Sequence, residues 1–168
     1  MNMSKKIITL LSWATVHLWL LIIFSLSSQP GPKSNDLSKS VTKQIVKATQ
    51  KVIVQNTYIK PRKNIMNKLN NLVRKYAHVV MYLVLGILVI NAFVISGIRA
   101  YKAFIFSLIF CLFYAASDEI HQLFVPGRVA KVTDVLIDGI GALIGIGLYK
   151  FIFKIYYTLK TKSSTKQL

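Results

Sequence analysis

The stretch AFIFSLIFCLFYAASDEIHQLFVPG, residues 103–127, decides the fold. Its first part, residues 103–116, carries no charge, and two acidic residues follow it before a Pro-Gly pair breaks the helical pattern. A helix needs about 20 residues to cross the hydrocarbon core of a membrane, so the uncharged part is too short to cross alone. The sequence therefore predicts a transmembrane span over residues 103–122 that carries ionisable side chains at one end.

The rest of the chain has the composition of a small membrane protein. It has 168 residues, of which 54% are hydrophobic, and this is more apolar surface than one soluble domain of that length can bury. The first apolar run is longer than the core of a signal peptide and lacks a clear cleavage site, so we expect it to remain as a span. We predict one domain, residues 1–168, and an all-α integral membrane bundle with four transmembrane helices at about 7–26, 77–95, 103–122 and 132–153.

Two basic segments lie outside these spans: the long first loop, residues 27–76, and the tail, residues 154–168. In the first loop, apolar residues recur every three or four positions between residues 37 and 54, and lysines recur on another face. This periodicity predicts an amphipathic helix. A basic polar face is typical of a helix that lies on an anionic membrane surface, and the alternative is a solvated helix within a loop.

The charge balance indicates the kind of partner. The net charge is +17, from 22 Lys and Arg residues against five acids. For a membrane-embedded chain, anionic lipid headgroups are the partner that this excess favours. The sequence contains no nucleic-acid-reading module, so no nucleic-acid partner is expected. The single cysteine, Cys111, excludes a disulfide within one chain and a cysteine-based metal site.

Alternating helix direction brings three polar segments to one side of the membrane. The start of the second span, the end of the third and the start of the fourth share a side, whichever way the protein is inserted. The fourth span carries Asp138 roughly 9 Å along its helix, at 1.5 Å per residue, and a carboxylate at that depth needs a partner inside the bundle. The residues that we expect to gather in a polar pocket are His78, Tyr82, Asp118, Glu119, His121, Gln122, Arg128, Asp134 and Asp138.

Three interpretations of this cluster stay open. The polar side chains could serve as interhelical hydrogen bonds and helix caps. They could form a binding pocket for a lipid headgroup or a lipid-linked precursor, with Arg128 as the candidate for an anionic group. They could also perform acid–base catalysis, with Asp118, Glu119 and His121 as candidates, or bind a divalent metal ion through a set drawn from His78, Asp118, Glu119, His121 and Asp134.

At these residues the sequence resembles the VanZ-like family. The resemblance covers residues 7–150, and members of the family often carry Asn where this chain has Asp138. The matching segments are Phe24–Gly31 at the end of the first span, His78-x3-Tyr82-x3-Gly86 in the second, the run from Ser117 to Arg128, and Asp134-x3-Asp138 with the glycines after it.

The resemblance implies a multi-pass protein of the bacterial plasma membrane, because the family's founding member is linked to resistance to the glycopeptide teicoplanin in Gram-positive bacteria. Our leading hypothesis is a protein that binds an envelope lipid or a lipid-linked cell-wall intermediate in the polar pocket. One alternative is a membrane-embedded enzyme, with or without a divalent metal, that acts on a lipid-linked substrate. Another is a non-catalytic partner subunit. Lys and Arg residues next to the span ends favour cytoplasmic N- and C-termini.

Overall fold

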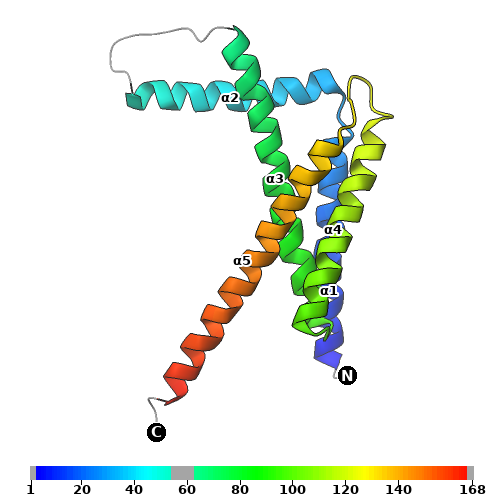
Figure 1. The fold of residues 1–168 in the computed structure, drawn as a ribbon, viewed down its shortest axis with the longest axis vertical. Coiled ribbons are helices and arrows are strands. Elements are labelled where there is room, and N and C mark those ends of the chain that lie inside the picture. The colour runs from blue at the N-terminus through cyan, green and yellow to red at the C-terminus, as the bar shows by residue number, and fades with distance from the viewer. Residues whose placement is uncertain (1–2, 54–62, 166–168) are drawn as a thin grey trace.

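The computed structural model describes residues 3–53 and 63–165. In these residues the chain is helical, without strands, and it forms five helices (Figure 1). The predicted all-α class is confirmed. The helices are α1 (Met3–Ser27), α2 (Gly31–Ile53), α3 (Lys63–Ile95), α4 (Ala100–Gln122) and α5 (Val132–Thr165).

Four of these helices are long and apolar enough to cross a membrane, as predicted. They are α1, the part of α3 from Lys68 to Ile95, α4, and the part of α5 from Val132 to Tyr156. The helices extend beyond the expected spans, because α3 begins within the basic first loop and α5 continues into the basic tail. Lysine and arginine are good helix formers, so a helix does not need to end where its apolar stretch ends. Residues 54–62 of the loop and 166–168 of the tail lie outside the described residues.

Helix α2 is the amphipathic helix predicted in the first loop. It lies across one end of the bundle (Figure 1). Its residues Val41 and Ile45 are exposed, whereas Thr42 is buried. Apolar side chains that remain exposed on a helix in this position are suited to contact with lipid at the membrane surface. The other apolar positions of this periodicity are Leu37, Ala48 and Val52, and their side chains lie outside the described ones.

Glycines allow α3 and α5 to cross in close contact. A Cβ atom on Gly141 would lie 2.5 Å from the carbonyl oxygen of Val79, and one on Gly145 would overlap the carbonyl oxygen of Leu83. On α3, a Cβ atom on Gly86 would overlap the carbonyl oxygen of Ala142. The spacing of the Gly141-x3-Gly145 pair predicts a close approach of another helix, and the structure shows that approach at this crossing. This crossing places the turn of α5 that precedes Gly141 against the start of the apolar part of α3.

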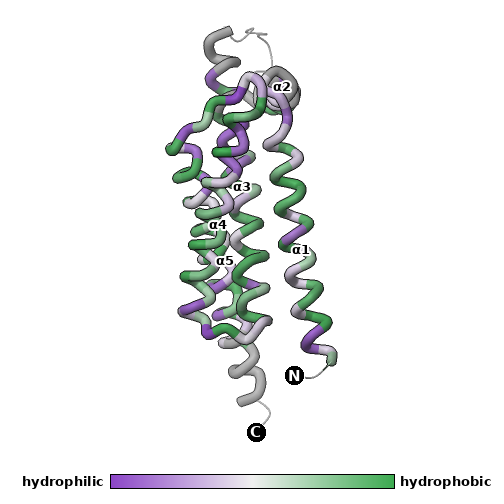
Figure 2. Tube along the Cα trace, turned by 90° about the vertical axis from the view of Figure 1, so that its right-hand side faces the viewer, coloured by the Kyte–Doolittle hydropathy of each residue, from purple (hydrophilic) through white to green (hydrophobic). Residues whose placement is uncertain are grey.

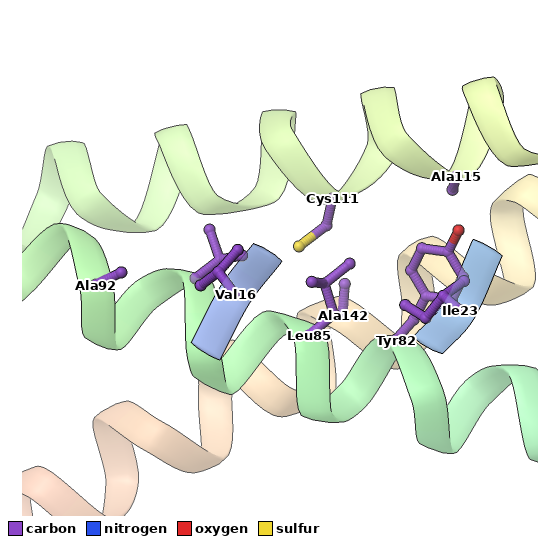
Figure 3. Close-up of a cluster of buried hydrophobic side chains, with 9 residues drawn as sticks. Val16, Ile23, Tyr82, Leu85, Ala92, Cys111, Ala115 and Ala142 are labelled. Carbon is purple, nitrogen blue, oxygen red and sulfur yellow. The ribbon is translucent and has the colours of Figure 1, made fainter. Parts of the chain in front are cut away.

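The core lies between the four spans. Figure 3 shows Leu85 of α3 facing Cys111 of α4, and the core also includes Tyr82 of α3, Val16 of α1 and Ala142 of α5. Outward-facing apolar side chains such as Phe113 and Phe151 are largely exposed, as lipid-facing residues are. Figure 2 shows the hydrophobic stretches of the spans along the bundle, with hydrophilic residues toward its ends. This arrangement leaves the polar residues of the spans at one end to form a site.

Candidate functional site: a polar cavity at one end of the bundle

A polar cavity of about 150 Å³ lies at the end of the bundle where α2 crosses. Its walls come from the start of α3, the end of α4, the α4–α5 loop and the start of α5, which are the segments that the alternation of helix direction predicts to meet. Its polar and charged lining residues are Arg74, Lys75, His78, Glu119, Gln122, Arg128, Lys131, Asp134 and Asp138.

His78 and Asp138 pair across the α3–α5 crossing. The Nδ1 atom of His78 lies 3.6 Å from Oδ1 of Asp138, close enough for an ion pair and longer than a hydrogen bond. The Asp138 side chain is 3% exposed, whereas that of His78 is 27% exposed and reaches the cavity. A carboxylate at this depth was expected to require a partner, and the structure places His78 in that position.

Arg128 connects the α4–α5 loop to the end of α1. Its Nε donates a hydrogen bond to the carbonyl oxygen of Gln29 (3.2 Å), and its Nη2 approaches that of Leu26 (3.5 Å). Its Nη1 approaches Oε1 of Gln122, also at 3.5 Å. Carbonyl groups in the last turn of a helix lack intrahelical partners, and the carbonyl of Leu26 is in the last turn of α1. Because guanidinium has five N–H donors, donors remain for a group in the cavity.

Burial lowers the pKa of Arg128, and the positive charge of Arg74 nearby acts in the same direction. The negative charges of Asp118 and Glu119 oppose this effect. An arginine remains protonated at neutral pH even so. Arg74 and Arg128 both line the cavity, and their positive charges therefore repel each other.

The turns that flank the cavity are held together by backbone contact. The N–H of Gly31 donates to the carbonyl oxygen of Pro126 at 3.1 Å, and a Cβ atom on Gly31 would overlap the carbonyl oxygen of Gly127. Gly127 has φ of 76°, a conformation that favours glycine. Nε2 of Gln122 donates to Oγ of Ser27 at 2.9 Å. The Ser-Ser-Gln-Pro-Gly segment, residues 27–31, and the Val-Pro-Gly-Arg segment, residues 125–128, thus pack against each other. We call this contact between the two turns the joint.

His121 belongs to this joint and does not line the cavity. Its Nε2 is hydrogen-bonded to Oγ of Ser28 at 3.1 Å, and its ring lies against Phe24 with the ring centroids 4.6 Å apart. Its observed contacts with α1 are those of a packing residue. His121 is therefore not among the lining residues, although its sequence position predicts it to gather with them.

Tyr82 and Asp118 lie behind the cavity wall. Both are buried, and neither lines the cavity. Asp118 accepts a hydrogen bond from Nε2 of Gln122 (3.2 Å) through Oδ2, whereas its Oδ1 and the Tyr82 hydroxyl have no partner among the described residues. Figure 3 shows the Tyr82 hydroxyl directed toward Ala115 of α4. Asp118 is thus connected to the cavity lining through its hydrogen bond with Gln122.

Glu119, Asp134 and Asp138 supply the acidic part of the lining. Glu119 Oε1 accepts a hydrogen bond from the backbone N–H of Lys131, which fixes its orientation. Asp134 lies in the first turn of α5, and its buried Oδ1 has no hydrogen-bond partner among the described residues. The cavity thus presents carboxylates as well as guanidinium groups.

The metal-binding candidates do not meet in the described part of the chain. No group of three or more His, Cys, Asp or Glu side chains there has an arrangement that could hold a metal ion. One reason is that His121 faces α1, away from Glu119 and Asp134.

Arg74, Lys75 and Lys131 line the cavity but are not among the predicted pocket residues. Arg74 and Lys75 belong to the predicted basic loop, but they lie on α3, and Arg74 is one helical turn before His78. Residues four apart on a helix share a face. Extending the helical spacing backward from His78 would have placed Arg74 beside it.

The fold and the site together define a multi-span helical membrane protein with a polar cavity at one end of its helical bundle. The VanZ/LLP1 family model matches residues 12–154, and the chain belongs to this family. The resemblance drawn from its motifs is therefore confirmed. No curated protein and no solved structure matches the chain.

Proposed function

We propose that this protein binds a phosphate-bearing lipid of the cell envelope and holds its phosphate in the polar cavity. The observation that carries this proposal is the pair of guanidinium groups, Arg74 and Arg128, at one wall of the cavity. Guanidinium binds phosphate through two parallel hydrogen bonds, which gives both strength and a fixed orientation.

The charge arrangement favours an anion between the two arginines. Arg74 makes no hydrogen bond or ion pair with another described residue. Two like charges close together are unfavourable, and a phosphate next to both would remove their repulsion. The cavity volume of about 150 Å³ suits a small headgroup, since a cavity of ~150 Å³ accommodates a ligand the size of benzene. A larger headgroup would extend out of the cavity toward water.

The acidic residues narrow the choice of headgroup. Glu119 and Asp134 line the same cavity, and carboxylates accept hydrogen bonds from hydroxyl and ammonium groups. A phosphate linked to a hydroxylated or amine-bearing group would satisfy both parts of the lining. Glycerophospholipids and lipid-linked sugars of cell-wall synthesis share this chemistry. Binding of such a lipid at the outer membrane surface is our account of the family's link to teicoplanin resistance.

The test compares Arg74→Gln with Arg99→Gln, which changes an exposed arginine in the loop at the other end of the bundle. Lipid phosphorus per mole of purified protein should fall at least twofold in Arg74→Gln and stay unchanged in Arg99→Gln. Arg74 is preferred to Arg128 because Arg128 also holds the end of α1. Equal lipid phosphorus in both variants, at normal expression, would contradict headgroup binding.

One observation favours a second function, hydrolysis of a lipid phosphate ester. His78 lines the cavity, and its Nδ1 faces the buried Asp138, an arrangement that orients the opposite ring nitrogen, Nε2, for general-base catalysis. In that reaction Nε2 accepts a proton from water, the water oxygen bonds to phosphorus, and the bond from phosphorus to the lipid oxygen breaks. The proton then passes to the departing oxygen.

The measurement for this second function is release of inorganic phosphate from dodecyl phosphate by the purified protein. Turnover that His78→Gln abolishes, while lipid phosphorus is retained, would establish catalysis. The absence of turnover in both proteins would leave lipid binding as the function.

A further inference from the structure

An apolar groove adjoins the polar cavity. Its volume is about 360 Å³, and it lies between the end of α1, the first half of α2 and α3. Its apolar lining includes Ile23 of α1, Val41 of α2, and Ala77 and Met81 of α3. The groove and the cavity share three lining residues, which are Arg74, His78 and Arg128.

Two of the four serines that line the groove, Ser27 and Ser38, have hydroxyl groups that are already hydrogen-bonded. Oγ of Ser38 donates to the carbonyl oxygen of Ser34 within α2, at 3.0 Å. A hydroxyl that is bonded back to its own helix needs no partner in the groove. Because serine side chains are small, they leave space in the groove. The apolar side chains that line the groove beside them can contact hydrocarbon.

We propose that this groove holds part of the hydrocarbon chain of the lipid whose phosphate occupies the polar cavity. This inference rests on the proposed function. The shared residues Arg74 and Arg128 stand where the phosphate of such a lipid would join its chain, so the positive charges are at one end of an apolar path. At about 30 Å³ for each water-sized group, the groove has room for about a dozen methylene-sized groups. That is a segment of one chain, and the remainder would extend into the bilayer.

Charge complementarity selects this occupant over a protein segment. A partner helix would bring its own backbone and polar side chains to two guanidinium groups and would leave the polar cavity unfilled. A lipid phosphate fills both compartments with one molecule. Because α2 lies across the end of the bundle with Val41 exposed, the groove is at the depth where a lipid's headgroup and chain meet.

The experiment uses hexadecyl phosphate with a photoreactive diazirine in the middle of its chain. The full-length protein is placed in nanodiscs of phosphatidylcholine, and cross-linked peptides are mapped by mass spectrometry. We expect labelling of the segments around Ile23, Val41 and Met81. Ala77→Trp, which fills the groove, should lower that labelling at least fivefold.

Ala14→Trp is the matched control, because Ala14 is exposed on α1 and lines neither compartment. It should leave the labelling unchanged. Ser38→Phe blocks the groove from the α2 side and provides a second test if Ala77→Trp does not fold. Labelling confined to outward faces such as that of Leu18, or labelling that neither blocking variant lowers, would overturn the inference.

The outcomes separate this inference from the proposed function. If Arg74→Gln lowers lipid phosphorus but the probe labels only outward faces, the headgroup site stands and the chain lies elsewhere. If Arg74→Gln changes neither lipid phosphorus nor labelling, the headgroup site fails and the groove inference fails with it.

Discussion

At the scale of single residues, the pairing of His78 with Asp138 explains how a carboxylate can lie within the bundle. Asp138 is 2% exposed, and His78 is the group that faces it at 3.6 Å. Removing one member of a buried polar pair leaves the other unsatisfied, at a cost of about 1–3 kcal/mol. The pair is therefore a structural contact as well as part of the cavity lining.

Substitutions at Asp138 should show which of its properties the fold needs. Asp138→Asn keeps the shape and an oxygen acceptor for His78, whereas Asp138→Leu removes both. We expect Asp138→Asn to unfold thermally within a few degrees of the wild type, and Asp138→Leu to lose about 1–3 kcal/mol of stability. Similar destabilisation by both substitutions in detergent-solubilised protein would show that the charge itself is required.

The roles of individual residues on α4 could be predicted only in part. Steps of three and four residues predict one shared face for Asp118, His121 and Gln122. The Asp118 and Gln122 side chains are hydrogen-bonded to each other, whereas His121 contacts Ser28 beyond the end of α1. Glu119 and His121 are two residues apart, so they cannot share a face, and the structure places them on opposite sides. The packing of α4 against α1 determines which of the two faces the cavity, and no sequence pattern reports that rotation.

At the scale of helices, the α3–α5 crossing positions the site. The glycines of α5 remove the side chains that would hold the two backbones apart. The sequence predicted the close approach from the spacing of Gly141 and Gly145, but it did not identify α3 as the partner. Any of the other spans could have met that face, because all of them are apolar.

Gly141→Val should separate α3 from α5. The added side chain would meet the Val79 backbone, and such overpacking costs about 1–3 kcal/mol. The shift would also move His78 away from Asp138, so lipid phosphorus should fall together with stability. Gly147→Val is the control, since a Cβ atom there has nothing within 4 Å. Equal loss of thermal stability in both variants would indicate that the effect is not due to the crossing.

At the scale of the whole molecule, alternating helix direction was sufficient to predict that three separate segments meet at one end. The cavity lining confirms this convergence. The sequence could not show that the end of α1 and the α4–α5 loop form one joint. Both segments have the composition of turns, and turn residues alone do not indicate which turns pack together. The apolar groove also depends on the position of α2, which periodicity does not fix.

The orientation of the molecule can be tested with a single introduced cysteine. The native Cys111 is buried, so a membrane-impermeant thiol reagent should not reach it. Lys43→Cys on α2 and Lys102→Cys near the start of α4 lie toward opposite ends of the bundle. With cytoplasmic termini, the reagent should label Lys43→Cys in intact cells and label Lys102→Cys only after permeabilisation. The reverse pattern would place the cavity on the cytoplasmic side.

The most direct test of lipid-phosphate binding is an experimental structure of the protein in nanodiscs that contain phosphatidylglycerol. We expect density for a phosphate within hydrogen-bonding distance of both Arg74 and Arg128, with density for a chain continuing into the groove beside Met81. A well-resolved cavity without phosphate density, in a particle whose outward faces carry ordered lipid, would contradict lipid-phosphate binding in the cavity.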